Sequence, residues 1–480
     1  MAARTLAFAF GVLLPLLLVR LMSQAQFGVY KQAFLVITTA QSILPLSFGT
    51  SAFYYLAREG ERKQAVVFHI VAYNMVVGLV ACLALLIRPG ILASIFGSTE
   101  LVPEAPLIGI AILLSLVGLF LEVVATAHQE AALSALFIVI AQLSKTLFMV
   151  IAALWWTSVR ALLCAAILQG ILQCGLLLWY LRSRFPGFWG AFEWRLLREQ
   201  LSYALPLGFS GIVFAAQTDL HNYFVAHTFG PAAFAVYSVG CFQLPVIALL
   251  RDSVGAVMIP RLSYLQQQGQ PREILLVTTR AMRKLAAVYW PAYVFLLVAG
   301  REFITVFFTK AYLASWPVFV VNLTLIPLGM IVNDPVLRAY MEERYFILKV
   351  RLLLLPLLVG VMWMGLRHFG MVGAIGTVVL IALIERLTVS WRVAVVLGAK
   401  AGDLRLLNDI WKLALLAGIA GLAAAVVRSL TLDLKPILVL AISGLVFAAV
   451  YLASVFAAGI ATPEERSWLR NQWARLSRTA

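Results

Sequence analysis

The sequence is short of charged residues, and this shortage excludes most classes of soluble protein. Asp, Glu, Lys and Arg make up only 12% of the 480 residues, whereas soluble domains carry about 25%. Hydrophobic residues make up 63%, and apolar runs recur from one end of the chain to the other. No stretch is long and polar enough for a large soluble domain, so the composition indicates an integral membrane protein.

Cysteine and histidine are also scarce. The four cysteines all fall within apolar runs, and none is spaced as Cys-x-x-Cys, so neither a disulfide framework nor a metal site is indicated. His69 and His128 likewise lack metal-ligand spacing, and we interpret them as structural residues with satisfied hydrogen bonds. The four cysteines are Cys82, Cys164, Cys174 and Cys241.

Enzyme signatures are absent from the sequence. It contains no His-Glu-x-x-His, Gly-x-Ser-x-Gly, P-loop or dinucleotide-binding glycine pattern in a suitable context. We therefore expect neither an enzyme nor a bound cofactor. Without a nucleotide site, any transport should be driven by an ion gradient or by removal of the product.

The apolar runs predict about fourteen membrane-spanning helices. A run of roughly 20 residues crosses a bilayer as a helix, and lipid cannot satisfy the backbone of open structures. The first run, between Arg4 and Ser23, also fits a secretory signal peptide, but a retained first span is the preferred interpretation. The predicted spans are 5–22, 33–56, 65–87, 107–127, 133–155, 160–181, 201–226, 232–258, 284–300, 315–335, 345–366, 371–392, 411–428 and 436–459.

Basic residues fall mainly on one side of this arrangement. If the N-terminus is cytoplasmic, the cytoplasmic segments carry 25 of the 37 Lys and Arg residues, and the outer segments carry nine. This asymmetry predicts that both termini are cytoplasmic. The net charge of +16 therefore reflects membrane topology, and we expect no nucleic-acid partner.

Two segments are expected to lie along the membrane surface. The loop 182–200 carries two tryptophans and is predicted to hold a short interfacial helix. The tail begins with a capping box at Thr462 and places Trp468 and Trp473 on one helical face beside arginines. We expect residues 461–480 to form an amphipathic helix on the cytoplasmic leaflet.

The two halves of the chain resemble each other. A constant offset of 212 aligns residues 95–130 with residues 307–342 and places Glu122 opposite Asp334. With six spans in each copy, both copies have the same orientation, which is a common construction in transporters. The predicted parts are a first lobe over 1–190 (spans one to six), a second lobe over 191–398 (spans seven to twelve), an appended pair of spans over 399–460, and the tail over 461–480.

The second half opens with residues 201–262, which predict two spanning helices joined by a turn at Gly230-Pro231. This stretch carries Asp219, Arg251 and Asp252 at membrane depth. Charge at this depth is costly and usually functional.

Several motifs of the chain are characteristic. They are Arg20-Leu-Met-Ser-Gln-Ala-Gln-Phe-Gly-Val-Tyr, Leu201-Ser-Tyr-Ala-Leu-Pro-Leu, Asp219, the segment from Phe229 to Tyr237, and Met258-Ile-Pro-Arg-Leu. These motifs resemble those of the bacterial polysaccharide flippase family, which belongs to the multidrug/oligosaccharidyl-lipid/polysaccharide exporter superfamily. The similarity covers about residues 4–398. The resemblance implies an all-α membrane fold with two six-helix lobes around a central cavity, in the bacterial inner membrane.

The resemblance also implies a substrate and partners. The substrate would be an undecaprenyl-pyrophosphate-linked oligosaccharide, moved from the cytoplasmic to the periplasmic leaflet. Membrane lipids, and polysaccharide polymerase or export proteins, would be its partners. Many family members have twelve spans, and the appended pair resembles the arrangement in lipid II flippases, so the identity of the sugar stays open.

A lipid-linked pyrophosphate requires cations in an otherwise apolar protein. Lys145 is the leading candidate, with Gln142 close by, because a lysine at a helix centre costs about 2.5–3.5 kcal/mol and should face water or a partner. Arg251 offers a fork of donors for phosphate, or it forms a structural ion pair. Arg20 and Arg58 flank the first two spans, where they line the route of the headgroup or extend to the lipid headgroups.

Carboxylates at membrane depth are candidates for ion coupling. Asp219 is the first candidate, because a carboxylate in lipid can exchange a proton when its surroundings change. Glu122 and Asp334 are the second, because the repeat places them symmetrically. A hydrogen bond in helix packing is the alternative role for this second pair.

Three other functions stay open at this point. A cation-coupled multidrug exporter of the same superfamily would have an acidic, aromatic cavity, whereas the charges here are mixed. A membrane polymerase or glycosyltransferase would need a catalytic group on a large loop, and no loop is longer than about 25 residues. A non-transporting scaffold of the cell envelope is the third.

Overall fold

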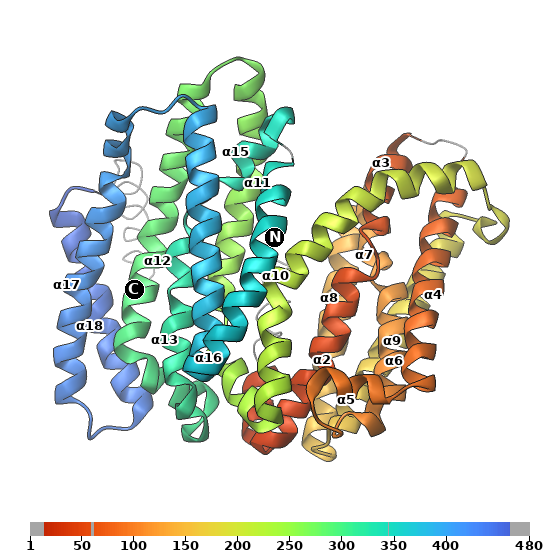
Figure 1. Cartoon of the computed structure of the whole chain (residues 1–480), viewed down its shortest axis with the longest axis horizontal. Helices are drawn as coiled ribbons and strands as arrows, with labels where there is room; N and C mark the ends of the chain where they lie inside the picture. Colours follow the sequence, from red (N-terminus) through yellow and green to blue (C-terminus); the bar gives the residue numbers. More distant parts are fainter. Residues whose placement is uncertain (1–13, 59–61, 344, 461–480) are drawn as a thin grey trace, which may run out of the picture. The chain divides into compact units, whose positions relative to one another are not determined.

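The protein is built from helices. The computed structural model describes residues 14–58, 62–343 and 345–460, and all regular secondary structure in these residues is helical (Figure 1). The helices of the first half are residues 14–21, α2 (Gln24–Ile43), α3 (Ser51–Arg58), α4 (Lys63–Ile87), α5 (Gly90–Phe96), α6 (Ala105–Gly118), α7 (Phe120–Ala127), α8 (Ala131–Trp155) and α9 (Val159–Arg184), with the 3-10 segments η1 (Phe48–Thr50), η2 (Val102–Glu104) and η3 (Phe188–Gly190).

The second half continues with longer and more interrupted helices. They are α10 (Trp194–Gly240), α11 (Pro245–Gln267), α12 (Pro271–Phe308), α13 (Trp316–Leu323), α14 (Leu325–Gly329), α15 (Asp334–Ala339), α16 (Phe346–Val396), α17 (Asn408–Leu430) and α18 (Pro436–Ala457), with η4 (Lys310–Ser315), η5 (Met341–Glu343) and η6 (Ala401–Leu407). The predicted tail helix over 461–480 lies outside the described residues.

Ten helices of the described chain are long and apolar enough to span a membrane, or eleven if the bent pair Gln24–Ile43 and Phe48–Arg58 is one span. The count of fourteen stays a prediction. The difference arises in three places. Half of predicted span 5–22 lies outside the described residues, α16 joins two predicted spans across Gly370 (φ 58°), and α11 holds Arg251, Asp252 and Arg261 within every 18-residue stretch.

The predicted turn at Gly230-Pro231 is present as a break inside α10, where Gly230 has φ 76°. The prediction of one continuous span over 232–258 is wrong, because helix α10 ends at Gly240 and α11 begins only at Pro245. Proline lacks a backbone N–H and disfavours the helical conformation of the residue before it. Leu244 is therefore held out of the helix.

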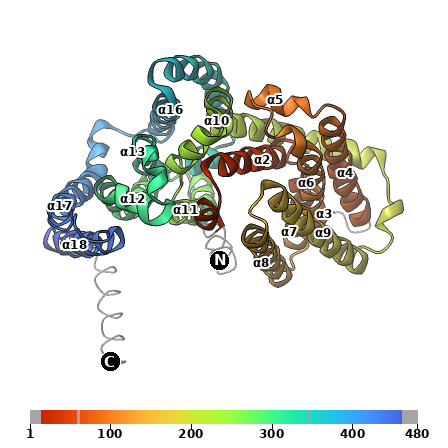
Figure 2. The same ribbon diagram turned by 90° about the horizontal axis from the view of Figure 1, so that it is seen from below.

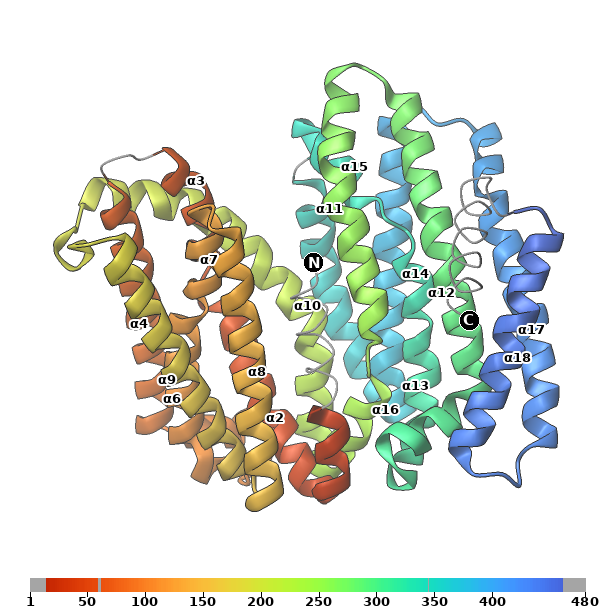
Figure 3. The ribbon, with the colours of Figure 1, turned by 180° about the vertical axis from the view of Figure 1, so that it is seen from behind.

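The chain divides into two compact units. Unit 1 contains the described residues of Met1–Pro245 together with Leu348–Val378, and unit 2 contains those of Val246–Ile347 and Val379–Ala480. In unit 1, α6 packs against both α4 and α9, and α9 packs against α8 (Figure 3). A buried apolar cluster that includes Phe48, Val66, Val124 and Leu181 fixes one end of these helices.

Helices α2 and α10 pack against each other in unit 1. A Cβ atom on Gly28 would overlap the carbonyl oxygen of Pro231, and one on Gly208 would overlap the carbonyl of Leu46. Small residues let helix backbones approach in a membrane, where lipid removes the hydrophobic advantage of burying larger side chains. Gly28 therefore limits how closely α2 and α10 approach each other, and Gly208 limits how closely α10 approaches the turn that follows α2.

In unit 2, α12 carries the C-terminal helices α17 and α18 along its length (Figures 1 and 2). Their shared apolar core includes Ala286, Leu413, Ala417 and Phe447. Polar contacts fix both ends of this arrangement. They are the ion pair between Arg428 and Glu302 with N–O distances of 2.8 and 3.0 Å, the bond from Arg283 to the carbonyl of Ile460, and the ion pair between Arg272 and Asp403.

Candidate functional site

Lys145 lies at the middle of α8, and its side chain is exposed. Four exposed leucines of α8 recur at intervals of seven, four and seven positions, so their side chains point in one direction and form a lipid-facing stripe. They are Leu136, Leu143, Leu147 and Leu154. Lys145 follows Leu136 by nine positions, which places it about 180° away on an α-helix. The lysine therefore lies on the side of α8 that packs inside unit 1.

The packed side of α8 is buried near both ends of the helix and exposed near its centre. Ser134 and Ala152 lie within about 20° of Lys145 around the helix, and both are buried. Lys145, between them, is exposed, and neighbouring Gln142 is half-buried. No carboxylate lies within ion-pair distance of Lys145 in the part of the chain that the structure describes.

The other predicted cations have partners. Arg251 lies 3.7 Å from Asp252 in α11, with both side chains more than half exposed. Arg20 donates to the carbonyl of Leu16, and Arg58 contacts Tyr54, with its guanidinium 4.1 Å from the centre of that ring. These contacts do not exclude phosphate binding, but each cation has a local interaction that Lys145 lacks.

The three predicted acids have different environments. Asp219 is half-buried on the same side of α10 as Gly208, Ala215 and Ala226, which is the side that packs against α2. Glu122 is half-buried in the first turn of α7. Asp334 forms an ion pair at 3.4 Å with Arg386, which also donates to the carbonyl of Ile331.

The acids aligned by the repeat both follow a break in a helix. Helix α6 ends at Gly118 and α7 begins at Phe120, two residues before Glu122. In the second half, α14 ends at Gly329, and Asp334 is the first residue of α15. Positions 119 and 331, which are separated by the offset of 212, lie in these two interruptions. The two interruptions differ in size, because Leu119 keeps helical dihedral angles (φ −57°, ψ −28°), whereas residues 330–333 separate α14 from α15.

Sequence reasoning missed Lys31 and a buried polar network. The predicted spans place Lys31 in the loop before span 33–56, but α2 begins at Gln24 and includes it. The sequence Gln-Ala-Gln-Phe-Gly-Val-Tyr-Lys-Gln is too polar to extend the apolar run. Its capping box at Ser23 and Gln26 was the signal that would have shown the helix start.

The buried network connects α4, α3 and the start of α10. The backbone N–H of Glu193 donates to Nε2 of His69 at 3.1 Å, so the proton of this ring lies on Nδ1 and is donated to Gln200 at 2.8 Å. Gln200 donates to Ser51 at 3.3 Å, and Ser51 donates to the carbonyl of Phe48 at 2.7 Å. His69 is thus a satisfied structural residue, as the sequence indicated.

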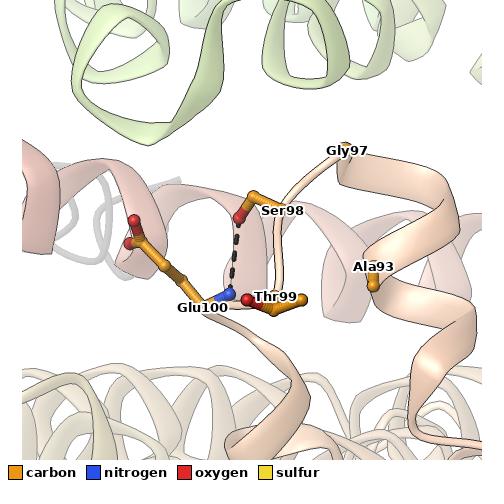
Figure 4. Close-up of a pocket in the computed structure, with 5 residues that line it drawn as sticks. All are labelled: Ala93, Gly97, Ser98, Thr99 and Glu100. Atoms are coloured by element: carbon orange, nitrogen blue, oxygen red, sulfur yellow. Dashed lines mark hydrogen bonds between the residues drawn. The ribbon is translucent and has the colours of Figure 1, made fainter.

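A surface hollow of about 510 Å³ lies at the loop between α5 and η2 (Figure 4). It is lined by Ala93, Gly97, Ser98, Thr99 and Glu100, and the N–H of Glu100 donates to the hydroxyl of Ser98 at 3.4 Å. None of the predicted site residues lines it. Among the described residues no three His, Cys, Asp or Glu side chains are placed to hold a metal ion.

Solved structures with this fold are transporters. The lipid II flippase MurJ in an inward closed conformation matches with a TM-score of 0.75 and 14% identity, over 96% of this chain and 99% of that chain. An inward-facing multidrug resistance MATE family transporter of the MOP superfamily gives 0.63 and 13%, over 82% and 96%. A MOP superfamily transporter from Pyrococcus furiosus gives 0.56 and 13%, over 83% and 93%.

These similarities show that the protein shares the fold of these transporters. Its long apolar helices are those of a multi-pass membrane protein. A comparison with curated protein sequences gives no match. The profile of the family described as polysaccharide biosynthesis protein matches residues 17–317. The chain therefore belongs to this family.

Proposed function

We propose that this protein is a flippase for an undecaprenyl-pyrophosphate-linked oligosaccharide. It moves the polysaccharide repeat unit from the cytoplasmic to the periplasmic leaflet of the inner membrane by alternating access of its two lobes. Both chain termini are cytoplasmic in this proposal. Family membership and the likeness to a lipid II flippase support this class of substrate.

The exposed, unpaired ammonium of Lys145 carries the proposal. A lysine at this depth is stable only when it meets water, a carboxylate or an anionic ligand. The described residues supply no carboxylate, and the stripe of leucines on the opposite side of α8 accounts for the contact with lipid. A pyrophosphate group is a strong acceptor for such a donor, while the polyprenyl tail can remain in the bilayer.

The remaining predicted residues have supporting roles in this proposal. Gln142 offers an amide to the sugar beside Lys145, and Arg20, Arg58 and Arg251 assist the headgroup where it enters or leaves. Asp219 is the leading candidate for coupling to an ion gradient, followed by Glu122. Asp334 couples to an ion only if its pair with Arg386 opens during the cycle. Polymerase or export proteins of the same pathway are the proposed protein partners.

A flipping assay in proteoliposomes tests the proposal. Wild type is compared with Lys145→Gln, Lys145→Arg, Arg251→Ala and the control Lys435→Gln, which changes an exposed loop lysine. The substrate is a fluorescent undecaprenyl-pyrophosphate oligosaccharide, and cleavage by an external glycosidase reports flipping. A hydrogen bond to a charged group contributes about 1.5–3 kcal/mol, so Lys145→Gln should slow flipping about 10- to 100-fold, while Lys145→Arg retains part of the activity.

A cation-coupled multidrug exporter is the second candidate. It is favoured by the likeness to MATE family transporters and by Asp219 at membrane depth. Wild type that flips none of several pyrophosphate-linked glycans, but exports organic cations in the same liposomes, would replace the first proposal with this one. In that case Asp219→Asn should abolish export, and Lys145→Gln should have little effect.

A further inference from the structure

Lys31 is a second lysine of unit 1 without an ion-pair partner. It lies seven residues beyond the start of α2 and is half-buried. Its ammonium lies 5.4 Å from the centre of the Phe27 ring, and Phe27 is fully buried. This cation–π contact holds the side chain in place and leaves the donors of the ammonium available. No carboxylate among the described residues lies within ion-pair distance of it.

Lys31 belongs to a polar stripe on α2. Thr38 and Ser42 lie within about 40° of it around the helix, and both are exposed. Their hydroxyls donate to the carbonyls of Phe34 and Thr38 at 2.8 and 2.9 Å, so each hydroxyl oxygen can still accept a hydrogen bond. A stripe of this composition is suited to water and sugar hydroxyls and is unsuited to lipid tails.

The stripe begins at the end of unit 1 that is opposite to the arginine-rich end. Gly28, less than one turn from Lys31, packs against Pro231 in the turn that follows Gly230. From Lys31 the chain continues through α2 and α3 to Arg58, a helical path of about 40 Å, at the end that the charge asymmetry predicts to be cytoplasmic. Lys31 therefore lies near the periplasmic end, and Lys145 lies near the middle of its helix.

Three arginines of unit 2, in contrast to Lys31 and Lys145, have ion-pair partners. Arg386, Arg392 and Arg428 are paired with Asp334, Glu343 and Glu302 at distances of 3.4, 2.5 and 2.8 Å. A buried charge with its own partner is satisfied structurally, while one without a partner requires water or a ligand. Lys31 and Lys145, both within unit 1, lack such a partner among the described residues.

The geometry points to Lys31 as an anion-binding residue at the exit end of unit 1. It receives the pyrophosphate of the polyprenyl-linked substrate after Lys145 has held it near mid-depth, while Thr38 and Ser42 accept hydrogen bonds from the sugar. This inference rests on the proposed flippase function and adds a second cation to the route. The shared chemistry is a phosphate bound by an ammonium, and an anionic phospholipid headgroup is the competing source of that phosphate.

Flipping rates test the role of the charge. Lys31→Gln should slow flipping of the pyrophosphate-linked glycan about tenfold, Lys31→Arg should retain most of the rate, and Lys435→Gln should match wild type. Thr38→Val should reduce the rate for a long glycan more than for a single sugar. If wild type and Lys145→Gln behave as proposed above and Lys31→Gln flips at the wild-type rate, this inference fails while the proposed function stands. If wild type does not flip, the proposed function fails as well.

Chemical labelling distinguishes the two sources of phosphate. Lys31→Cys is placed in a chain whose native cysteines are replaced by alanine, and it is labelled with an impermeant cationic methanethiosulfonate. We expect labelling from the periplasmic side, protection by farnesyl pyrophosphate but not by farnesol, and partial recovery of flipping on labelling. If phosphatidylglycerol vesicles alone protect the cysteine from labelling as well as farnesyl pyrophosphate does, residue 31 binds a phospholipid headgroup and the inference is overturned. Labelling only from the cytoplasmic side would also overturn it.

Discussion

At the scale of single residues, the hydrogen bonds of His69 show how a polar group can be structural inside this membrane protein. His69, Gln200 and Ser51 are at most 2% exposed. The ring of His69, the amide of Gln200 and the hydroxyl of Ser51 are joined by consecutive hydrogen bonds, so the network resembles a satisfied polar core. It holds the first turns of α10 to α3 and α4, at the arginine-rich end of unit 1.

Removing the central member should destabilise the fold. Gln200→Leu leaves the Nδ1 proton of His69 without an acceptor, and one buried unsatisfied donor costs about 1–3 kcal/mol. We expect a lower thermal unfolding midpoint in detergent for Gln200→Leu. The control Gln267→Leu changes an exposed glutamine at the end of α11 and should leave the midpoint unchanged. Equal midpoints for both variants would show that the network contributes nothing measurable.

The sequence was informative about single residues only where hydropathy alone decides their position. Lys145 interrupts a long apolar run, so its location at mid-helix could be predicted from composition. Lys31 could not, because the polar residues around it resemble a loop. Pairings such as that of Arg386 with Asp334 depend on how α15 and α16 pack, and no local pattern encodes that contact.

At the scale of helices, close packing of α2 against α10 depends on single glycines. A Cβ on Gly28 meets a backbone carbonyl, which cannot move aside as a flexible side chain can. Overpacking of this kind costs about 1–3 kcal/mol. Gly175 in α9 offers a matched case, because it is exposed and a Cβ there meets nothing within 4 Å.

Two glycine-to-alanine variants separate the cost of overpacking from the general preference of helices for alanine. Gly28→Ala should lower the unfolding midpoint, because α2 and α10 must move apart. Gly175→Ala should keep or raise it, since alanine is favoured over glycine in a helix by up to about 1 kcal/mol. Thermal melts of both variants in one detergent provide the measurement. A stabilised Gly28→Ala would contradict the packing of α2 on α10 described above.

Breaks in helices were predictable where glycine or proline causes them, and not elsewhere. The break at Gly230 was predicted because glycine adopts a positive φ without strain. The interruption between α6 and α7 at Leu119 directly follows Gly118, but Gly118 has no positive φ, so this glycine did not mark a break as Gly230 did. The span boundaries derived from hydropathy were therefore close for α4, α8 and α9, and wrong for residues 232–258.

At the scale of the whole molecule, the C-terminal helices are fixed on a single element of unit 2. Lipid tails are as apolar as leucine, so apolar area alone does not hold helices together in a bilayer. Close approach and polar contacts must hold them. Gly444 faces the ring of Phe295 at 3.3 Å from its ideal Cβ position, and Tyr451 donates to the carbonyl of Ala287 at 3.0 Å.

The ion pair of Arg428 and Glu302 adds a clamp at the end of α17. It is bidentate, and the side chains are 27% and 11% exposed. Breaking such a pair by removing one partner is costly, because the remaining charge stays buried. Together with the contacts along α12, the ion pair of Arg428 and Glu302 makes α17 and α18 a packed part of unit 2. They should therefore move together with α12.

Cutting the chain tests whether packing alone holds helices α17 and α18 on α12. A protease site is inserted after Gly398, in the loop before η6, and the purified protein is cleaved in detergent. We expect fragments 1–398 and 399–480 to co-elute on size exclusion, because the contacts with α12 do not need the covalent link. Gly421→Leu should release the smaller fragment, since a Cβ at Gly421 lies 2.5 Å from a methyl group of Val294. Gly418→Leu, on the same helix with nothing within 4 Å of its Cβ, should not. Separation of the wild-type fragments would instead mean that the pair is attached mainly through the loop, and that α17 and α18 can move independently of α12.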